Sequence, residues 1–419
     1  MRSQLQKWLQ ISLFNLMLVA FIGVILRYKI AYALPWVDQK NLLHGHSHFA
    51  FAGWISQALM ALLVYYLSVT SGENYFIKYR RILYANLITA YGMLLSFPVQ
   101  GYGLVSILFS TISVFVAYGF SISYWRDLNK ISRRWFIHSW FKMALLGNIF
   151  SSIGPFSLAY MMASHHLHQK MYLAAVYFFL HFQYNVWFLF SCMGLLIWHL
   201  YSYLRSPGVL KKIFFYFAWA AAPTYFLSLL WWPVPGWLFI LVVLATFSQL
   251  YGWILLVKTI LQHTDAMKKI IPWFSGILFL FSAIAFSVKL CLQTGSVIPS
   301  LSKLAFGFRP IVIGYLHLVL LGVITMFIIA FTVSEKLIVL NRNSITGIKI
   351  FVLGVFFNEG LLMTQGISDL QNAGVPGINR FLLLAAAILF TGMFLIVSGQ
   401  FLQKDDQNHN SSGISEPAL

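Results

Sequence analysis

The sequence predicts an all-α membrane protein with about twelve transmembrane helices. Of its 419 residues, 60% are hydrophobic and only 9% are charged, and the mean hydropathy is +0.78. A soluble core cannot hide so much apolar surface. The apolar residues also form separate runs, each close to the roughly 20 residues that cross about 30 Å of hydrocarbon. These observations exclude a soluble protein.

Twelve apolar runs meet this length criterion, and no soluble domain fits between them. We therefore expect one transmembrane domain over residues 1–403 and a polar, disordered cytoplasmic tail at 404–419. The first run is too long for a cleaved signal peptide and lacks a small-residue cleavage pattern. The expected spans are residues 8–33, 46–69, 82–100, 103–122, 137–162, 172–200, 213–231, 236–257, 272–294, 309–333, 348–366 and 380–402.

The distribution of basic residues predicts the orientation. Lys and Arg accumulate on the cytoplasmic side of inner-membrane proteins. With the N-terminus inside, most of the 28 basic residues fall at cytoplasmic ends and loops, as at 78–81 and 268–269. We therefore predict a bacterial-type inner-membrane protein, in contact with membrane lipid, with both termini in the cytoplasm. The same rule accounts for the net charge of +18, so nucleic acid is not an expected partner.

Histidines stand at the mouth of the second span. His44, His46 and His48 directly precede or begin the run 46–69. An ionisable side chain inside a membrane is costly and usually functional, and His is a common ligand of haem iron, zinc and copper. The alternative is that these are interfacial histidines bonded to headgroups and water.

Two later spans carry a histidine at a similar depth. His181 lies about nine residues into the sixth span and His317 about eight residues into the tenth, or roughly 14 and 12 Å at 1.5 Å per residue. Spans 2, 6 and 10 all run from outside to inside, so these histidines share the outer half of the bilayer. If spans 2 and 10 are neighbours, His317 can face His46 or His48 across a planar macrocycle, as in a bis-histidine haem.

The loop before the sixth span contains three more histidines, His165, His166 and His168. A tract of this kind binds zinc or copper in some proteins, and in others it is a solvated loop. We interpret Arg27 and Lys289 as interfacial residues whose charged ends reach the membrane surface.

The arrangement resembles subunit I of the haem-copper oxidase superfamily, which includes the C-type cytochrome oxidases and the nitric oxide reductases. Residues 314–322, GYLHLVLLG, resemble the tenth-helix signature Gly-His-x-His-x-x-x-Leu-Gly of the C-type oxidases. The resemblance makes His317 a ligand of the low-spin haem. Residues 58–61, ALMA, resemble the end of the family's second helix and make His46 the other ligand, with His48 as the alternative.

The resemblance implies one haem b and a partner for its propionates. In the family, arginines in the loop between the last two helices bind the propionates. Residues 373–376, AGVP, resemble that loop and are followed by Asn379 and Arg380. Arg380 is therefore the implied propionate partner, and the alternative is an interfacial anchor.

The departures from the family concern its oxygen-reducing centre. Tyr315 replaces the His that holds the high-spin haem, and the seventh span has no histidine to complete the metal site to which His181 would belong. Copper or non-haem iron with one helical His is under-coordinated. The centre is therefore expected to be lost or remodelled. Because Tyr can ligate haem iron, a second haem on Tyr315, facing a pocket for NO at His181, stays open.

These inferences predict a haem-binding protein for electron transfer, or for sensing haem or a gas, with a respiratory electron donor or partner subunits. One alternative is an enzyme, a variant nitric oxide or oxygen reductase with other ligands. The other is a proton-coupled secondary transporter with its site at His181, Gln183, Asn185 and Glu359. Glu359 is the one carboxylate near the middle of a span, and it is either a buried structural acid or part of a proton relay.

Overall fold

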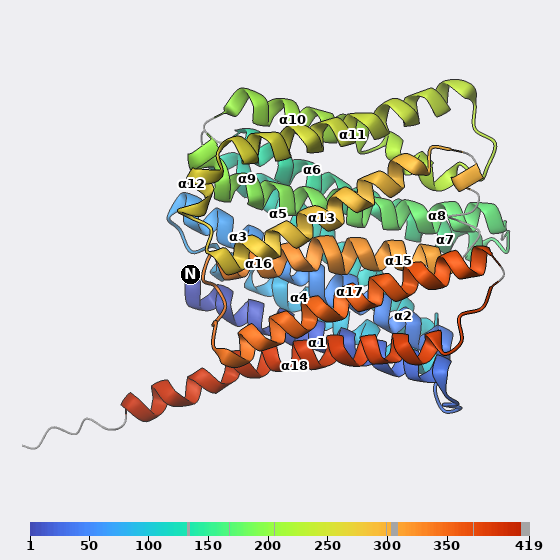
Figure 1. Cartoon of the computed structure of the whole chain (residues 1–419), viewed down its shortest axis with the longest axis horizontal. Coiled ribbons are helices and arrows are strands. Elements are labelled where there is room, and N and C mark those ends of the chain that lie inside the picture. Colours follow the sequence, from blue (N-terminus) through green and yellow to red (C-terminus); the bar gives the residue numbers. More distant parts are fainter. Residues whose placement is uncertain are drawn as a thin grey trace, which may run out of the picture.

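The computed structural model is a bundle of long helices, and the residues that it describes form no strand (Figure 1). Among these residues, eleven helices are long and apolar enough to cross a membrane. The prediction of a multi-pass, all-α membrane protein is therefore confirmed. The structure describes residues 1–131, 135–166, 168–204, 206–298, 300–302, 309–371 and 373–411.

Both described ends of the chain lie at the same end of the bundle, on the left in Figure 1. We call this the N-terminal end and the other the far end. The helices are α1 (Arg2–Ala31), α2 (Gln39–Phe49), η1 (Ala50–Ser56), α3 (Gln57–Ser71), α4 (Tyr75–Gln100), α5 (Leu104–Lys130), α6 (Trp135–Ser151), α7 (Ile153–Ala163), α8 (Gln169–His181), η2 (Phe182–Phe188), α9 (Leu189–Leu204), α10 (Pro207–Ala220), η3 (Pro223–Leu229), α11 (Gly236–Gln262), α12 (Thr264–Lys268), α13 (Trp273–Gly295), α15 (Arg309–His317), η4 (Leu318–Thr325), α16 (Met326–Ser334), α17 (Arg342–Leu370) and α18 (Ile378–Ser411).

Two predicted boundaries differ from the structure. The expected span 213–231 is not one continuous helix, because α10 ends at Ala220 and a 3-10 helix, η3, begins at Pro223. Proline lacks the N–H that an α-helix needs and clashes with the preceding turn. At the C-terminus, α18 continues to Ser411, past the predicted start of the tail, and residues 412–419 lie outside the described chain.

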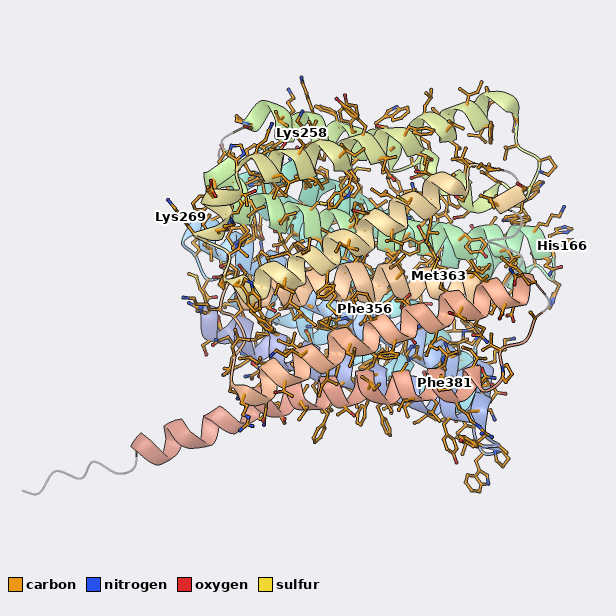
Figure 2. All side chains as sticks on the ribbon, in the orientation of Figure 1. His166, Lys258, Lys269, Phe356, Met363 and Phe381 are labelled. Atoms are coloured by element: carbon orange, nitrogen blue, oxygen red, sulfur yellow. The ribbon has the colours of Figure 1, made fainter. Side chains whose placement is uncertain are left out.

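Three helical segments form the centre of the bundle, and they are the ones that carry the predicted histidines. These central helices are α2–η1–α3, α8–η2–α9 and α15–η4–α16. In their apolar windows 83%, 61% and 72% of the residues are buried, against at most 44% in the other eight spanning helices. The outer helices present apolar side chains outward, as Phe356, Met363 and Phe381 do on α17 and α18 (Figure 2).

Packing along the central helices is uneven. Residues 319–334 are nearly all buried, whereas residues 310–318 of the same span all keep some accessible surface. The contrast recurs in another central helix, where most of residues 189–200 are buried and residues 176–180 all keep some accessible surface. The core is therefore tight toward the N-terminal end and looser toward the far end, where the predicted histidines lie.

Helices α17 and α18 approach each other through glycines. A Cβ atom added at Gly347 would lie 2.7 Å from both the Gly392 carbonyl oxygen and the Ile396 nitrogen, and one at Gly392 would lie 2.6 Å from the Phe351 nitrogen. Membrane helices gain little from expelling water and associate by close packing of small residues. These two glycines therefore set the spacing of the pair.

Replacing Gly347 by Ala should destabilise the folded protein by about 1–3 kcal/mol, because the new methyl group overlaps the α18 backbone. Gly360→Ala is the matched control on the same helix, since nothing lies within 4 Å of a Cβ atom at Gly360. Thermal unfolding in detergent should show a lower midpoint for Gly347→Ala only. Equal midpoints would contradict the close approach.

Candidate functional site

A π-helical segment follows each candidate histidine on the central helices. Two of these segments begin directly after His181 and His317, and the third begins two residues after His48. The π-helix is rare and frequently marks functional sites. The backbone is therefore irregular at the three places where the sequence predicted ligands. The segments are η1, η2 and η4.

Side chains from neighbouring helices satisfy backbone carbonyls of two of these π-helices, η1 and η4. Such partners are needed because unbonded carbonyls are costly in a bilayer. The irregular turns are thus stabilised from outside the helix. The bonds join Asn15 Nδ2 to Gly53 O (2.6 Å), Asn86 Nδ2 to Ala52 O (3.0 Å) and Ser282 Oγ to Val323 O (2.8 Å).

Two indole hydrogen bonds connect the three π-helices. Trp54 Nε1 on η1 donates to Thr325 Oγ1 on η4 at 3.0 Å. Trp187 Nε1 on η2 donates to Ser56 Oγ on η1 at 3.2 Å. All four side chains are buried. The π-helices therefore form one connected unit behind the histidines.

His317 acts electrostatically on His46. His317 Nδ1 donates to the Ile313 carbonyl oxygen at 2.8 Å, so its Nε2 carries the lone pair. His46 Nδ1 has no partner at hydrogen-bonding distance within the described chain, although the Val19 backbone lies nearby. Both residues keep some accessible surface. The pair therefore has the chemistry of two available imidazole ligands.

Helix α1 forms a wall beside this pair. A Cβ atom at Gly23 would lie 3.7 Å from His46 Cε1, in ordinary contact, so the absent side chain leaves the edge of the ring uncovered. Arg27, one turn further along α1, acts electrostatically on both His46 and His317. This side of α1 therefore combines a position without a side chain, Gly23, with the positive charge of Arg27.

His48 lies on the other side of α2. Its ring stacks on Phe97 with centroids 4.5 Å apart and an interplanar angle of 11°, and its Nε2 lies 3.5 Å from the Tyr102 hydroxyl. Burial raises the pKa of Tyr102 to about 12, so the hydroxyl keeps its proton at neutral pH. Residues two apart on a helix point in nearly opposite directions. The sequence left His46 and His48 as alternatives, and only His46 adjoins His317.

His44 belongs to the same aromatic group as His48. Its ring centroid lies 4.7 Å from that of Tyr102, and its Nε2 is buried without a hydrogen-bond partner among the described residues. This predicted metal residue thus adjoins aromatic rings and His48, on the side of α2 away from His317.

His181 uses both ring nitrogens within the protein. Nε2 donates to the Ala221 carbonyl oxygen at 2.8 Å, and Nδ1 accepts from Asn185 Nδ2 at 3.2 Å. Ala221 stands where α10 ends before Pro223, so its carbonyl is not needed by a continuing α-helix. In this arrangement His181 links η2 to α10 and has no free lone pair for a metal.

Tyr315 lies on the face of α15 opposite His317. Its ring packs edge-on against Tyr184, with centroids 6.3 Å apart, and Tyr184 precedes the Asn185 that binds His181. Tyr315 therefore lies on the side of α15 that faces η2.

The other predicted site residues are dispersed. His165, His166 and His168 are exposed on the α7–α8 loop at the far end, where Figure 2 labels His166. Arg380 is exposed at the start of α18. Within the described ranges, no three His, Cys, Asp or Glu side chains come together as a metal-binding group. Glu359 accepts a hydrogen bond from its neighbour Asn358 on α17 at 3.1 Å.

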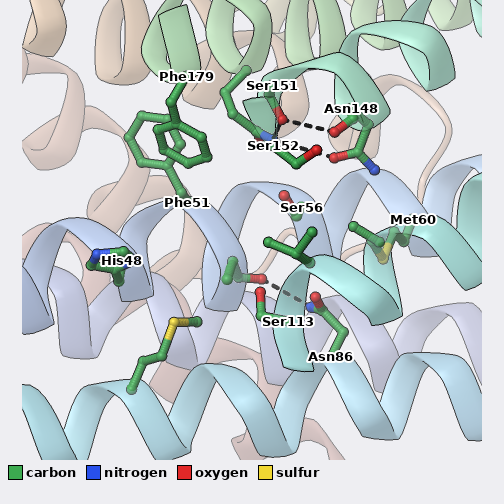
Figure 3. Close-up of a pocket in the computed structure, with 15 residues that line it drawn as sticks. His48, Phe51, Ser56, Met60, Asn86, Ser113, Asn148, Ser151, Ser152 and Phe179 are labelled. Atoms are coloured by element: carbon green, nitrogen blue, oxygen red, sulfur yellow. Dashed lines mark hydrogen bonds between the residues drawn. The ribbon is translucent and has the colours of Figure 1, made fainter. Parts of the chain in front are cut away.

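A small cavity with polar and apolar lining lies beside η1, with His48 at one end and Met60 at the other (Figure 3). Its volume is about 70 Å³, which is room for about two water molecules at roughly 30 Å³ each. Gln183 lines it and donates to Ser151 Oγ at 2.8 Å. The cavity is too small for a macrocycle. Its polar lining residues are His48, Ser56, Asn86, Ser113, Asn148, Ser151, Ser152 and Gln183.

The interpretation of Lys289 as an interfacial residue is wrong. Lys289 is only 1% exposed, and its Nζ donates to Gln293 Oε1, whose amide in turn donates to Gln249 Oε1 at 2.8 Å. It also acts electrostatically on His181. The Gln four residues after Lys289 was a visible signal, but Gln249 is on another helix and no local pattern identifies it.

The sequence matches no protein-family model and no curated protein.

Removing the acceptor of Trp54 should destabilise the bundle. Thr325→Val keeps the shape of the side chain but leaves a buried indole N–H unpaired, at a cost of about 1–3 kcal/mol. Thr364→Val, at an exposed position whose hydroxyl bonds only its own helix, is the matched control. Thermal unfolding in detergent should separate the two variants, and an unchanged midpoint for Thr325→Val would show that the bond between η1 and η4 contributes little.

Proposed function

We propose that this multi-pass membrane protein binds one low-spin haem b between His46 and His317 and uses it to transfer electrons or to sense haem or a gas. The observation that supports this most is the pairing of the two imidazoles. They come from helices that are remote in sequence, and neither residue is fully buried.

The residues of this site fit a bis-histidine haem. The Nδ1–H of His317 is held by the Ile313 carbonyl oxygen, which fixes the ring and increases the basicity of Nε2 as a ligand. Gly23 leaves the edge of the His46 ring open. The looser packing at residues 310–318 also favours a ligand at this level of the bundle.

Haem would supply a one-electron couple at this site. The protein's contribution would be to orient the two imidazoles and to keep water away. The hydrogen bond from Trp54 to Thr325 ties the two ligand-bearing helices just beyond the histidines. Two imidazole ligands would leave no open position on the iron for a substrate, which favours electron transfer over oxygen chemistry at this position.

We further propose that the oxygen-reducing centre of the haem-copper oxidases is lost or remodelled in this chain. Tyr315 stands where the family has its second haem ligand. The bonds of His181 to Ala221 and Asn185 leave that ring no lone pair for copper or non-haem iron. We also propose that the helices of this chain are arranged as in subunit I of that family.

We also propose that the N-terminal end of the bundle faces the cytoplasm. Both described ends lie at the N-terminal end of the bundle, and basic residues such as Lys269 stand there (Figures 1 and 2). The positive-inside tendency then favours cytoplasmic termini in a bacterial-type inner membrane. An electron donor or partner subunits of a respiratory chain would meet the haem from the far end or within the membrane.

Replacing either His46 or His317 by Ala should abolish the low-spin haem spectrum, because each substitution removes one axial ligand. His48→Ala is the matched control on the same helix and should retain the spectrum. The measurements are the reduced-minus-oxidised absorption spectrum and the haem content by pyridine haemochrome. A wild-type spectrum in His46→Ala and His317→Ala would refute the ligand assignment.

Quantification of haem and metals in the purified protein should give one haem per chain without stoichiometric copper or non-haem iron. The physical reason is the commitment of His181 to Ala221 and Asn185 and the dispersal of the remaining histidines. Two haems with one copper or iron per chain, together with consumption of oxygen or NO, would contradict the loss of the reducing centre.

A further inference from the structure

Arg27 differs from the other basic residues near the far end. It is only partly exposed on α1, and the ion pairs of the described residues are formed by Asp127 and Glu335, without Arg27. An unpaired guanidinium within a membrane span is costly and calls for an anionic or hydrogen-bonding partner. The interpretation of Arg27 as a simple interfacial anchor leaves its position unexplained.

Arg27 lies one helical turn from Gly23, so both face the same side of α1. Gly23 contacts the edge of the His46 ring, and Arg27 interacts electrostatically with His46 and His317. The guanidinium therefore belongs to the side of α1 that faces His46, one turn closer to the far end of the bundle than Gly23.

Among the described residues, no acidic side chain forms an ion pair with Arg27. Asp38, on the loop after α1, accepts a hydrogen bond at 2.7 Å from the backbone N–H of Asn41 and caps α2. Within the described part of the chain, the guanidinium beside the two histidines therefore has no ion-paired carboxylate. A ligand with its own carboxylate would supply the missing charge.

We propose that Arg27, and not Arg380, binds a carboxylate of the ligand held between His46 and His317. This inference rests on the proposed haem function and names the group that orients the haem. The planar guanidinium matches a carboxylate with two parallel hydrogen bonds, and haem carries two carboxylates on one edge. Arg380 is exposed at the start of α18. An anionic lipid headgroup offers similar chemistry to Arg27, and the experiment must separate the two sources.

The test compares Arg27→Met with Arg380→Met as the matched control, and with Arg27→Lys. The full chain, depleted of haem, is titrated with iron protoporphyrin IX and with its dimethyl ester, which lacks the carboxylates, in bilayers of neutral lipid. Arg27→Met should weaken binding of the diacid about ten- to hundredfold and leave binding of the ester at the wild-type level. Arg27→Lys should lie between Arg27→Met and the wild type, and Arg380→Met should match the wild type.

Each other outcome overturns the inference in a recognisable way. Equal loss of diacid and ester in Arg27→Met would show a merely structural role, and unchanged diacid binding would show no role. Loss of diacid binding in Arg380→Met would show that Arg380 binds the haem propionates, as the sequence implied. If Arg27→Met weakens binding of the diacid only in bilayers that contain anionic lipid, Arg27 binds a lipid headgroup instead. If the wild type takes up neither compound, the proposed haem function itself fails.

Discussion

The hydrogen bonds of two buried indoles hold the centre of this bundle in register. Trp54 joins η1 to η4 through Thr325, and Trp187 joins η2 to η1 through Ser56. In a bilayer the helices gain little from expelling water, so close packing and bonds of this kind select which helices become neighbours. Because η1 takes part in both bonds, it positions the helix of His46 against the helix of His317.

The same constraint separates the histidines by role. Every polar group within the membrane needs a partner, and His181 finds both of its partners in the protein, at Ala221 and Asn185. His317 finds only one, at Ile313. His46 finds none at hydrogen-bonding distance in the part of the chain that is described. The ring nitrogens that remain unused are the ones that favour an external ligand.

Much of the candidate site followed from the sequence because depth in a membrane is a local property. Run lengths and the rise per residue put His181 and His317 in the same half of the bilayer. In the structure both fall in the first half of spans that begin with α8 and α15, which Figure 1 shows toward the far end. The choice between His46 and His48 depended on which face of α2 packs against α1 and which face packs against Phe97 and Tyr102, at and just after the end of α4. A single sequence does not contain that information.

The sequence by itself determined the all-α membrane class, the approximate spans and the helices that carry histidine. These follow from hydropathy and helix geometry, which act over a single span. Only the tertiary structure decided that His46 meets His317, that Lys289 is enclosed by Gln293 and Gln249, and that Arg27 adjoins the histidine pair. Those contacts join residues on different helices, and they depend on side-chain packing between segments that no local pattern relates.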